Sequence, residues 1–164
     1  MSRTLIYLLL FFLTGCGSRF RDKKISSILT LPAFTILSVD STTRLSSQNI
    51  PDGYPLIFMY FSPTCEHCQK EIKEIIKNGS KLGKAKIYCI SNDPAEQIKA
   101  FYIEYNLSSN KNIFMGQDYN YSFYNHFLPP SVPFFAIYNS NKSLIKLYKE
   151  EIAVNSLIYS ISNN

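Results

Sequence analysis

The chain has 164 residues, of which 46% are hydrophobic and 18% are charged, a balance typical of one globular domain and not of a disordered chain. The formal net charge is +5, but the basic residues are scattered and form no arginine-rich helix, so we do not expect nucleic-acid binding. The four cysteines, at positions 16, 65, 68 and 89, are compatible with two disulfides, one metal site or separate roles.

The first fifteen residues have the pattern of a signal peptide. Arg3 is their only charged residue, and the apolar run over 5–13 is too short to span a membrane, which takes roughly 20 residues. The run ends in Leu-Thr-Gly-Cys at 13–16, which resembles the lipobox of bacterial lipoproteins, where the cysteine is lipidated and becomes the N-terminus. We therefore predict a signal peptide over 1–15 and lipidation of Cys16. The alternative is a short uncleaved anchor with an incidental cysteine.

Residues 16–31 are predicted to form a tether, and residues 32–164 the folded domain. The tether holds four basic residues close to the predicted lipid: Arg19, Arg21, Lys23 and Lys24. Such a cluster can rest on anionic headgroups and reinforce the anchor, and a solvated spacer explains the same residues equally well.

Segments of strand and helix character alternate along the predicted domain. A hairpin is expected first, with strands over 34–39 and 44–47 around a turn at Asp40. Leu56–Phe61 is a continuous apolar run, typical of a strand buried on both faces. The other expected elements are helices over 66–78, 94–106 (capped by Asp93), 118–127 and 152–161, and strands over 85–90, 112–115, 133–138 and 144–148. This order predicts an α/β sandwich with a mixed central sheet.

A Cys-x-x-Cys motif lies where the strand over 56–61 gives way to the helix that starts at Glu66. Unpaired backbone N–H groups and the helix dipole stabilise negative charge at a helix start. Cys65 is therefore biased towards the thiolate, the form that attacks disulfides. Cys68 lies further inside the helix, less exposed but close enough to attack the resulting mixed disulfide. We predict that Cys65 attacks and Cys68 resolves.

These features, followed by Val132-Pro133 before a strand, a hairpin and a terminal helix, resemble the thioredoxin fold over about residues 34–162. More narrowly, the chain is similar to the membrane-tethered TlpA/ResA-type thiol-disulfide oxidoreductases. That family carries an N-terminal β-hairpin and an extra strand-helix insertion between the active-site helix and the proline. The resemblance implies a thioredoxin-like α/β sandwich with a mixed sheet flanked by helices and with both additions.

The resemblance also implies roles for three further residues. Val132-Pro133 matches the family's cis-proline loop, which lies beside the reactive cysteine and lets the backbone of the preceding residue pair with a bound polypeptide. Glu71 stands three residues after the second cysteine, where members often carry a glutamate that can relay a proton. A solvated helix face, with ion pairs to neighbours such as Lys70, explains Glu71 equally simply.

Other residues near the motif depart from the family pattern. Thr64 stands where the family usually has tryptophan, and the chain contains no tryptophan. Between the cysteines, Glu66 opposes a thiolate at Cys65, whereas the imidazolium or imidazole N–H of His67 favours it. The two effects leave the reduction potential undetermined. Because Glu66 opposes the thiolate, it favours a less oxidising, more reductant-like protein.

Rival chemistries fit the sequence less well. A peroxiredoxin motif requires proline where Phe58 stands. A structural zinc site needs four ligands, but one Cys-x-x-Cys with His67 and the distant His126 supplies no second pair. The alternatives that remain are copper binding by Cys65, Cys68 and a histidine, and a non-catalytic thioredoxin-like binding lipoprotein.

Two residues outside the motif are interpreted as structural. Cys89 lies in an apolar strand, where a free cysteine packs like a small hydrophobic residue. His126 lies among aromatic residues and is interpreted as the edge of an aromatic cluster. We expect no metal and no cofactor.

Taken together, the sequence predicts a lipid-anchored oxidoreductase of the bacterial cell envelope that faces the periplasm. Its partners are expected to be protein thiols and disulfides, an upstream redox partner and the membrane, which it contacts through its N-terminal lipid. Gly17 stands where an aspartate would mark inner-membrane retention in enteric bacteria, which favours the outer membrane. The substrate and the direction of electron flow stay open.

Overall fold

The computed structural model describes residues 28–163, so the predicted signal peptide, Cys16 and the tether up to residue 27 lie outside the described residues. The first described residues, at the end of the predicted tether, contact the sheet. Thr30 forms an isolated bridge with Ser143, and the Tyr138 hydroxyl donates to the carbonyl of Ile28 at 2.9 Å. Within residues 28–163, no helix combines the length and the apolar character needed to cross a membrane.

Seven strands form one mixed sheet. They are β1 (Thr35–Ser38), β2 (Arg44–Ser46), β3 (Leu56–Tyr60), β4 (Lys86–Ser91), β5 (Ile113–Gln117), β6 (Phe134–Tyr138) and β7 (Leu144–Tyr148). Their order across the sheet is β2-β1-β5-β4-β3-β6-β7. The central pairs β3–β4 and β4–β5 are parallel, whereas β1–β2, β1–β5, β3–β6 and β6–β7 are antiparallel. The predicted N-terminal hairpin and mixed sheet are therefore confirmed.

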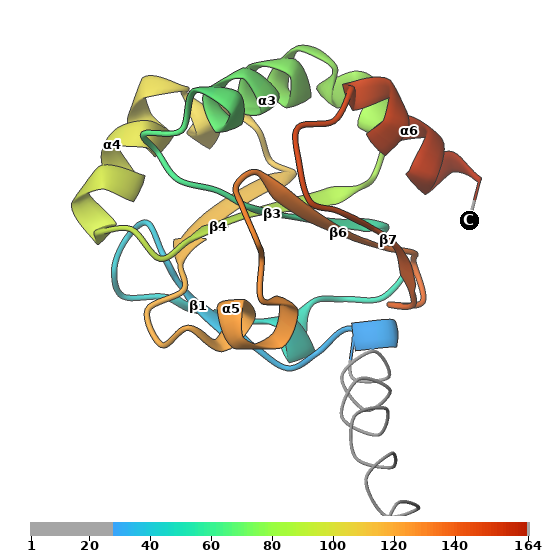
Figure 1. Cartoon of the computed structure of the whole chain (residues 1–164), viewed down its shortest axis with the longest axis horizontal. Coiled ribbons are helices and arrows are strands. Elements are labelled where there is room, and N and C mark those ends of the chain that lie inside the picture. The colour runs from blue at the N-terminus through green and yellow to red at the C-terminus, as the bar shows by residue number, and fades with distance from the viewer. Residues whose placement is uncertain (1–27, 164) are drawn as a thin grey trace, which may run out of the picture.

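Helices cover both faces of this sheet. They are α3 (Glu66–Lys77), α4 (Ala95–Glu104), α5 (Ser122–Phe127) and α6 (Val154–Ser162), with short 3₁₀ turns at 47–49, 79–82 and 107–109. Figure 1 shows α3, α4 and α6 on one face and α5 on the other. Strand β5 and helix α5 lie between α3 and Pro133 in the chain, where the predicted insertion was placed.

The sheet separates two layers of hydrophobic core, because successive side chains of a strand point to opposite faces. In β3, Ile57 and Met59 pack with residues of α3, α4 and α6, whereas Phe58 and Tyr60 pack with the aromatic side chains of α5. All five residues of β3 are buried, as are all five of β6. The continuous apolar run over 56–61 is therefore explained as predicted, by a strand that is buried on both faces.

Helix α4 begins differently from the prediction. Asp93 was expected to cap it, but the helix starts at Ala95 and the residue before it is Pro94, in an extended conformation. The Asp93 carboxylate instead accepts the hydroxyl of Ser91 at 2.8 Å. The expected cap is therefore wrong, because Asp93 forms a local turn at the end of β4.

Helix α5 is shorter than the predicted helix over 118–127 and starts at Ser122. Tyr121 has a left-handed backbone with φ 56°, which interrupts a helix before that point. Asp118 is fully buried, and its carboxylate accepts the amides of Phe123 at 3.1 Å and Tyr124 at 2.8 Å. Asp118 therefore satisfies the first N–H groups of the helix from outside it.

Candidate active site

Cys65 lies just after β3 and is the N-cap residue of α3. Its backbone is extended, and its Sγ accepts the backbone N–H of Cys68 at 3.3 Å. A serine or threonine hydroxyl takes this role at an ordinary helix start. The sulfur therefore sits at the positive end of the helix dipole with an amide directed at it, an arrangement that stabilises a thiolate.

Cys68 lies behind Cys65, fully buried in the core layer beneath α3. Burial raises the pKa of the Cys68 thiol, and its hydrogen bond with Cys65 raises it further. Both residues are free thiols in this structure. The two thiols therefore differ in environment: Cys65 is partly exposed at the helix start, whereas Cys68 is buried inside the domain and its pKa is raised.

The loop before β6 brings Val132 and Pro133 to the first cysteine. The Val132-Pro133 peptide bond is cis, as the family resemblance implied. The Cys65 thiol donates to the carbonyl oxygen of Val132 at 3.8 Å, across 67 positions of sequence. The structure therefore brings Cys65, Cys68, Val132 and Pro133 together, and it places a backbone carbonyl next to the Cys65 sulfur.

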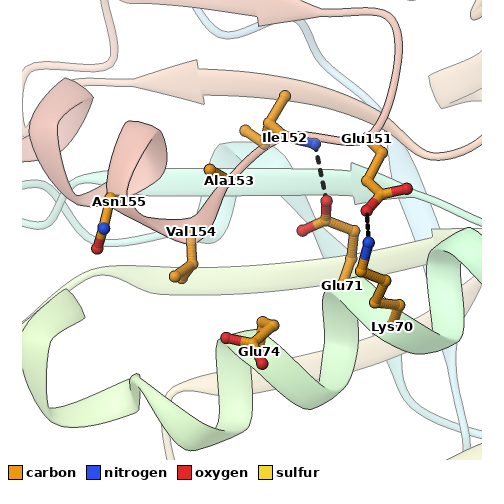
Figure 2. Close-up of a pocket in the computed structure, with 8 residues that line it drawn as sticks. All are labelled: Lys70, Glu71, Glu74, Glu151, Ile152, Ala153, Val154 and Asn155. Atoms are coloured by element: carbon orange, nitrogen blue, oxygen red, sulfur yellow. Dashed lines mark hydrogen bonds and ion pairs between the residues drawn. The ribbon is translucent and has the colours of Figure 1, made fainter.

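Glu71 lies one turn beyond Cys68 on the inner side of α3 and is only 3% exposed. Its Oε1 accepts the backbone N–H of Ile152 at 2.7 Å (Figure 2), while its Oε2 is buried and has no hydrogen-bond partner among residues 28–163. Burial raises the pKa of Glu71, and the negative charge of Glu151 adds to the rise, whereas the Ile152 amide lowers it. A solvated helix face is therefore the wrong description of Glu71.

The cleft beside Glu71 has a volume of about 610 Å³ and lies between α3 and the loop that leads into α6. Figure 2 shows the Glu71 carboxylate at the wall of this cleft, directed towards the loop. The lining residues are Lys70, Glu71, Glu74, Glu151, Ile152, Ala153, Val154 and Asn155. The predicted proton-relay residue thus borders a space that water can reach.

Sequence reasoning missed Glu151, which lies in the loop after β7. Its Oε2 is 2.7 Å from Nδ1 of His67, and its Oε1 accepts the ammonium group of Lys70. These two contacts lower the pKa of Glu151, the Lys70 contact most. No motif signals this residue, because 84 positions separate it from His67.

Cys89 and His126 lie away from the dithiol. Cys89 is fully buried in β4, and burial raises the pKa of its thiol to about 12, so its predicted packing role is confirmed. His126 places Nε2 2.9 Å from the carbonyl oxygen of Ala33. Over residues 28–163, no group of three or more histidine, cysteine, aspartate or glutamate side chains is arranged to hold a metal ion.

The fold matches solved structures, although no protein-family model and no curated protein sequence matches the chain. A secreted disulfide oxidoreductase of Mycobacterium tuberculosis, homologous to E. coli DsbE, has a TM-score of 0.67 at 15% identity, over 80% of this chain and 96% of that one. StoA from Bacillus subtilis has a TM-score of 0.58 at 14% identity, over 80% and 98%. Peroxidoxin BcpB from M. tuberculosis has a TM-score of 0.67 at 13% identity, over 80% and 92%.

Identities this low establish the fold and leave the reaction to the residues of the site. The same point follows from the neighbours themselves, which include both disulfide oxidoreductases and a peroxidoxin. With its mixed sheet, its Cys-x-x-Cys at the start of α3 and its cis-proline before β6, the chain has the thioredoxin fold.

Proposed function

We propose that this protein is a thiol-disulfide oxidoreductase that exchanges disulfides with protein substrates through Cys65 and Cys68. The observation that carries the proposal is the asymmetry of the pair. Cys65 caps α3 with its sulfur facing an amide and the Val132 carbonyl, and Cys68 is buried behind it. Such a pair separates the attacking role from the resolving role.

The proposed reduction proceeds in two exchanges. The Cys65 thiolate attacks one sulfur of a substrate disulfide, a new S–S bond forms, and the second substrate sulfur leaves as a thiolate. Cys68 then gives up its proton and attacks Cys65 Sγ, which releases the first substrate sulfur. The substrate gains two electrons and two protons, and the protein is left with a Cys65–Cys68 disulfide that an upstream dithiol must reduce. Oxidation of a substrate is the same sequence in reverse.

Glu71 is proposed to accept the proton of Cys68 during the second exchange. Burial is the main cause of the raised pKa of Cys68, and the negative charge of Glu71, one turn further along α3, adds to it. A buried carboxyl group with a raised pKa is closer to the protonation midpoint at neutral pH than an exposed one. Its unpaired Oε2 leaves an acceptor for the proton.

Val132 and Pro133 are proposed to hold the substrate. The Val132 carbonyl already contacts the Cys65 thiol, so an extended peptide that pairs with the Val132 backbone would bring its own sulfur to Cys65. Backbone pairing selects an extended chain and not a particular side chain. This site therefore fits a range of protein disulfides.

The cellular place of this reaction is proposed to be the bacterial envelope, with Cys16 lipidated and the domain in the periplasm. The leader pattern over 1–16 supports this, as does the similarity to a protein described as secreted. A Cys16→Ser chain should lose incorporation of labelled palmitate and move to the soluble fraction. Density separation of membranes then assigns the wild-type protein to the outer or inner membrane.

The mechanism is tested with three cysteine variants of the domain and a disulfide-bonded protein substrate. Cys65→Ser should abolish exchange, Cys68→Ser should accumulate a mixed disulfide with the substrate, and Cys89→Ser is the control that keeps exchange. Normal exchange by Cys65→Ser would refute the mechanism. Retention of one copper ion by the reduced protein with little exchange would point instead to metal binding. Proteins trapped in cells by Cys68→Ser identify the substrates.

A further inference from the structure

The loop between β7 and α6 contacts both the cis-proline loop and helix α3 of the proposed site. The Ser131 hydroxyl, in the cis-proline loop, donates to the carbonyl of Lys149 at 2.6 Å. The next contacts run to α3: Glu151 binds side chains of its first turns, and the Ile152 amide binds Glu71. One short segment thus joins the substrate loop, the dipeptide between the cysteines and the buried carboxylate.

Glu151 makes the closest charged contacts of this loop. Each of its two carboxylate oxygens has a separate partner on α3: Nδ1 of His67 at 2.7 Å and the ammonium group of Lys70. Figure 2 shows the Lys70 contact at the mouth of the cleft. The Glu151 side chain is 31% exposed, against 71% for His67 and 68% for Lys70. The Glu151 carboxylate is therefore the least exposed of the three groups, and the two more exposed side chains of His67 and Lys70 contact it from α3.

Both partners of Glu151 lie on α3 close in sequence to Cys65. His67 lies two residues after Cys65, in the first turn of α3, and Lys70 lies one turn further. Positive charge at these positions favours a thiolate at the helix start. Glu151 supplies a compensating negative charge next to Lys70 and also holds the imidazole of His67 against the loop.

Other charged groups belong to the same environment. On α3 they are Glu66 in the first turn, the buried Glu71, and Glu74, which has Lys77 within 3.8 Å. On the loop they are Lys149 and Glu150, which flank Glu151 in sequence. Of these, Glu150 is exposed and is the residue before Glu151, so it offers an equal negative charge for comparison.

We propose that Glu151 is a positioning residue of the dithiol couple, which holds the side chains of His67 and Lys70 at the β7–α6 loop and places a negative charge beside the first turns of α3. Less positive charge near the sulfur stabilises the reduced form less, so Glu151 makes the couple more reducing than its Glu66-His67 dipeptide alone would make it. The inference rests on the proposed function, because it gives Glu151 an influence on the reduction potential of the Cys65/Cys68 couple.

The test is Glu151→Gln, which keeps the size and one acceptor oxygen of the side chain and removes its charge. Alkylation of Cys65 by iodoacetamide at pH 6 should become about two- to fivefold faster, the range expected for a partly exposed ion pair. Cys68 and Cys89 are buried, so the rapid phase reports on Cys65. The equilibrium constant for reduction of the disulfide by glutathione, measured at pH 8, should rise as well, because a more stable thiolate favours the reduced form.

Glu150→Gln is the matched control, because it removes an equal charge one residue away, and it should leave both quantities nearly unchanged. The effect of Glu151→Gln should also shrink in a His67→Gln or Lys70→Met background, since a side chain that holds the Glu151 carboxylate at α3 is then absent. Circular dichroism and the thermal unfolding midpoint report separately on any loosening of the loop.

Two results would overturn the inference. One is a Glu151→Gln protein that matches Glu150→Gln in alkylation and glutathione equilibrium. The other is an effect of Glu151→Gln that persists undiminished without His67 and Lys70. Neither measurement uses a protein substrate, so a protein that fails to exchange disulfides with proteins but shows the Glu151 effect refutes only the proposed function.

Discussion

Replacement of Glu71 by glutamine should stabilise the domain at alkaline pH and leave it unchanged at acidic pH. Glutamine has nearly the same shape and keeps an oxygen that can accept the Ile152 amide. It differs in that it cannot ionise. The buried carboxylate is opposed by desolvation and by the charge of Glu151, and these effects together exceed the help from the Ile152 amide, so the pKa of Glu71 is raised.

The sign of the pH dependence follows from linkage. A raised pKa means that the folded state holds the proton more tightly than the unfolded state. The contribution of Glu71 is therefore fully present below the ordinary value of 4.5 and is lost as the pH rises through the raised pKa. Both side chains leave one buried polar atom without a partner, so we expect only the low end of a burial cost, on the order of 1 kcal/mol at pH 8. For a domain of this size that is about 3 to 5 °C in Tm.

The assay is urea unfolding of the wild-type domain and Glu71→Gln between pH 4 and pH 9. Glu74→Gln is the matched control on the same helix, because the Glu74 side chain is 43% exposed and close to Lys77. The wild-type free energy of unfolding should decline relative to that of Glu71→Gln as the pH rises. If Glu71→Gln is less stable than wild type at pH 8, or if the difference does not depend on pH, the argument from burial is wrong.

Two further substitutions test the packing around the site. Gly116→Ala should cost about 1 to 3 kcal/mol in urea unfolding, because the added Cβ would lie 2.6 Å from the backbone oxygen of Leu37 in β1. Gly79→Ala is its control, with no atom within 4 Å of the added Cβ, and an equal cost for both variants would contradict the explanation. Cys89→Ala should cost roughly 1 kcal/mol through the small cavity that it leaves, with unchanged exchange kinetics. A changed exchange rate would show that Cys89 takes part in the redox chemistry.

Much of the fold could be predicted from local patterns. The run over 56–61 has no polar face, and only a strand covered on both sides buries all of it, as β3 is. The start of α3 was equally readable, because Cys65 and the apolar spacing after it mark a helix boundary. The starts of α4 and α5 were not, since Pro94 and Tyr121 take backbone conformations set by the loops before them. Asp118 caps α5 with its side chain although it stands four residues before the first residue of the helix.

The site was predicted only in part, for a related reason. The two cysteines are three residues apart in sequence, so their spacing at the start of a helix fixes the distance between them. Glu71 lay on the border between the apolar and polar faces of its helix, and the pattern allowed both burial and exposure. Its burial follows from the Ile152 amide and the loop that covers it, which enter 81 residues later in the chain.

The sequence by itself determined the order of strands and helices and the placement of Cys65 at a helix start, because both depend on short-range periodicity and on the unpaired amides of a helix end. The family resemblance placed the Val132-Pro133 loop beside that cysteine, and the tertiary structure decided which atoms surround it. The Val132 carbonyl beside Cys65, the burial of Glu71 and the pairing of Glu151 with His67 join residues separated by 67, 81 and 84 positions. These contacts form when β6 and the loop before α6 pack against α3, and no local pattern specifies that packing.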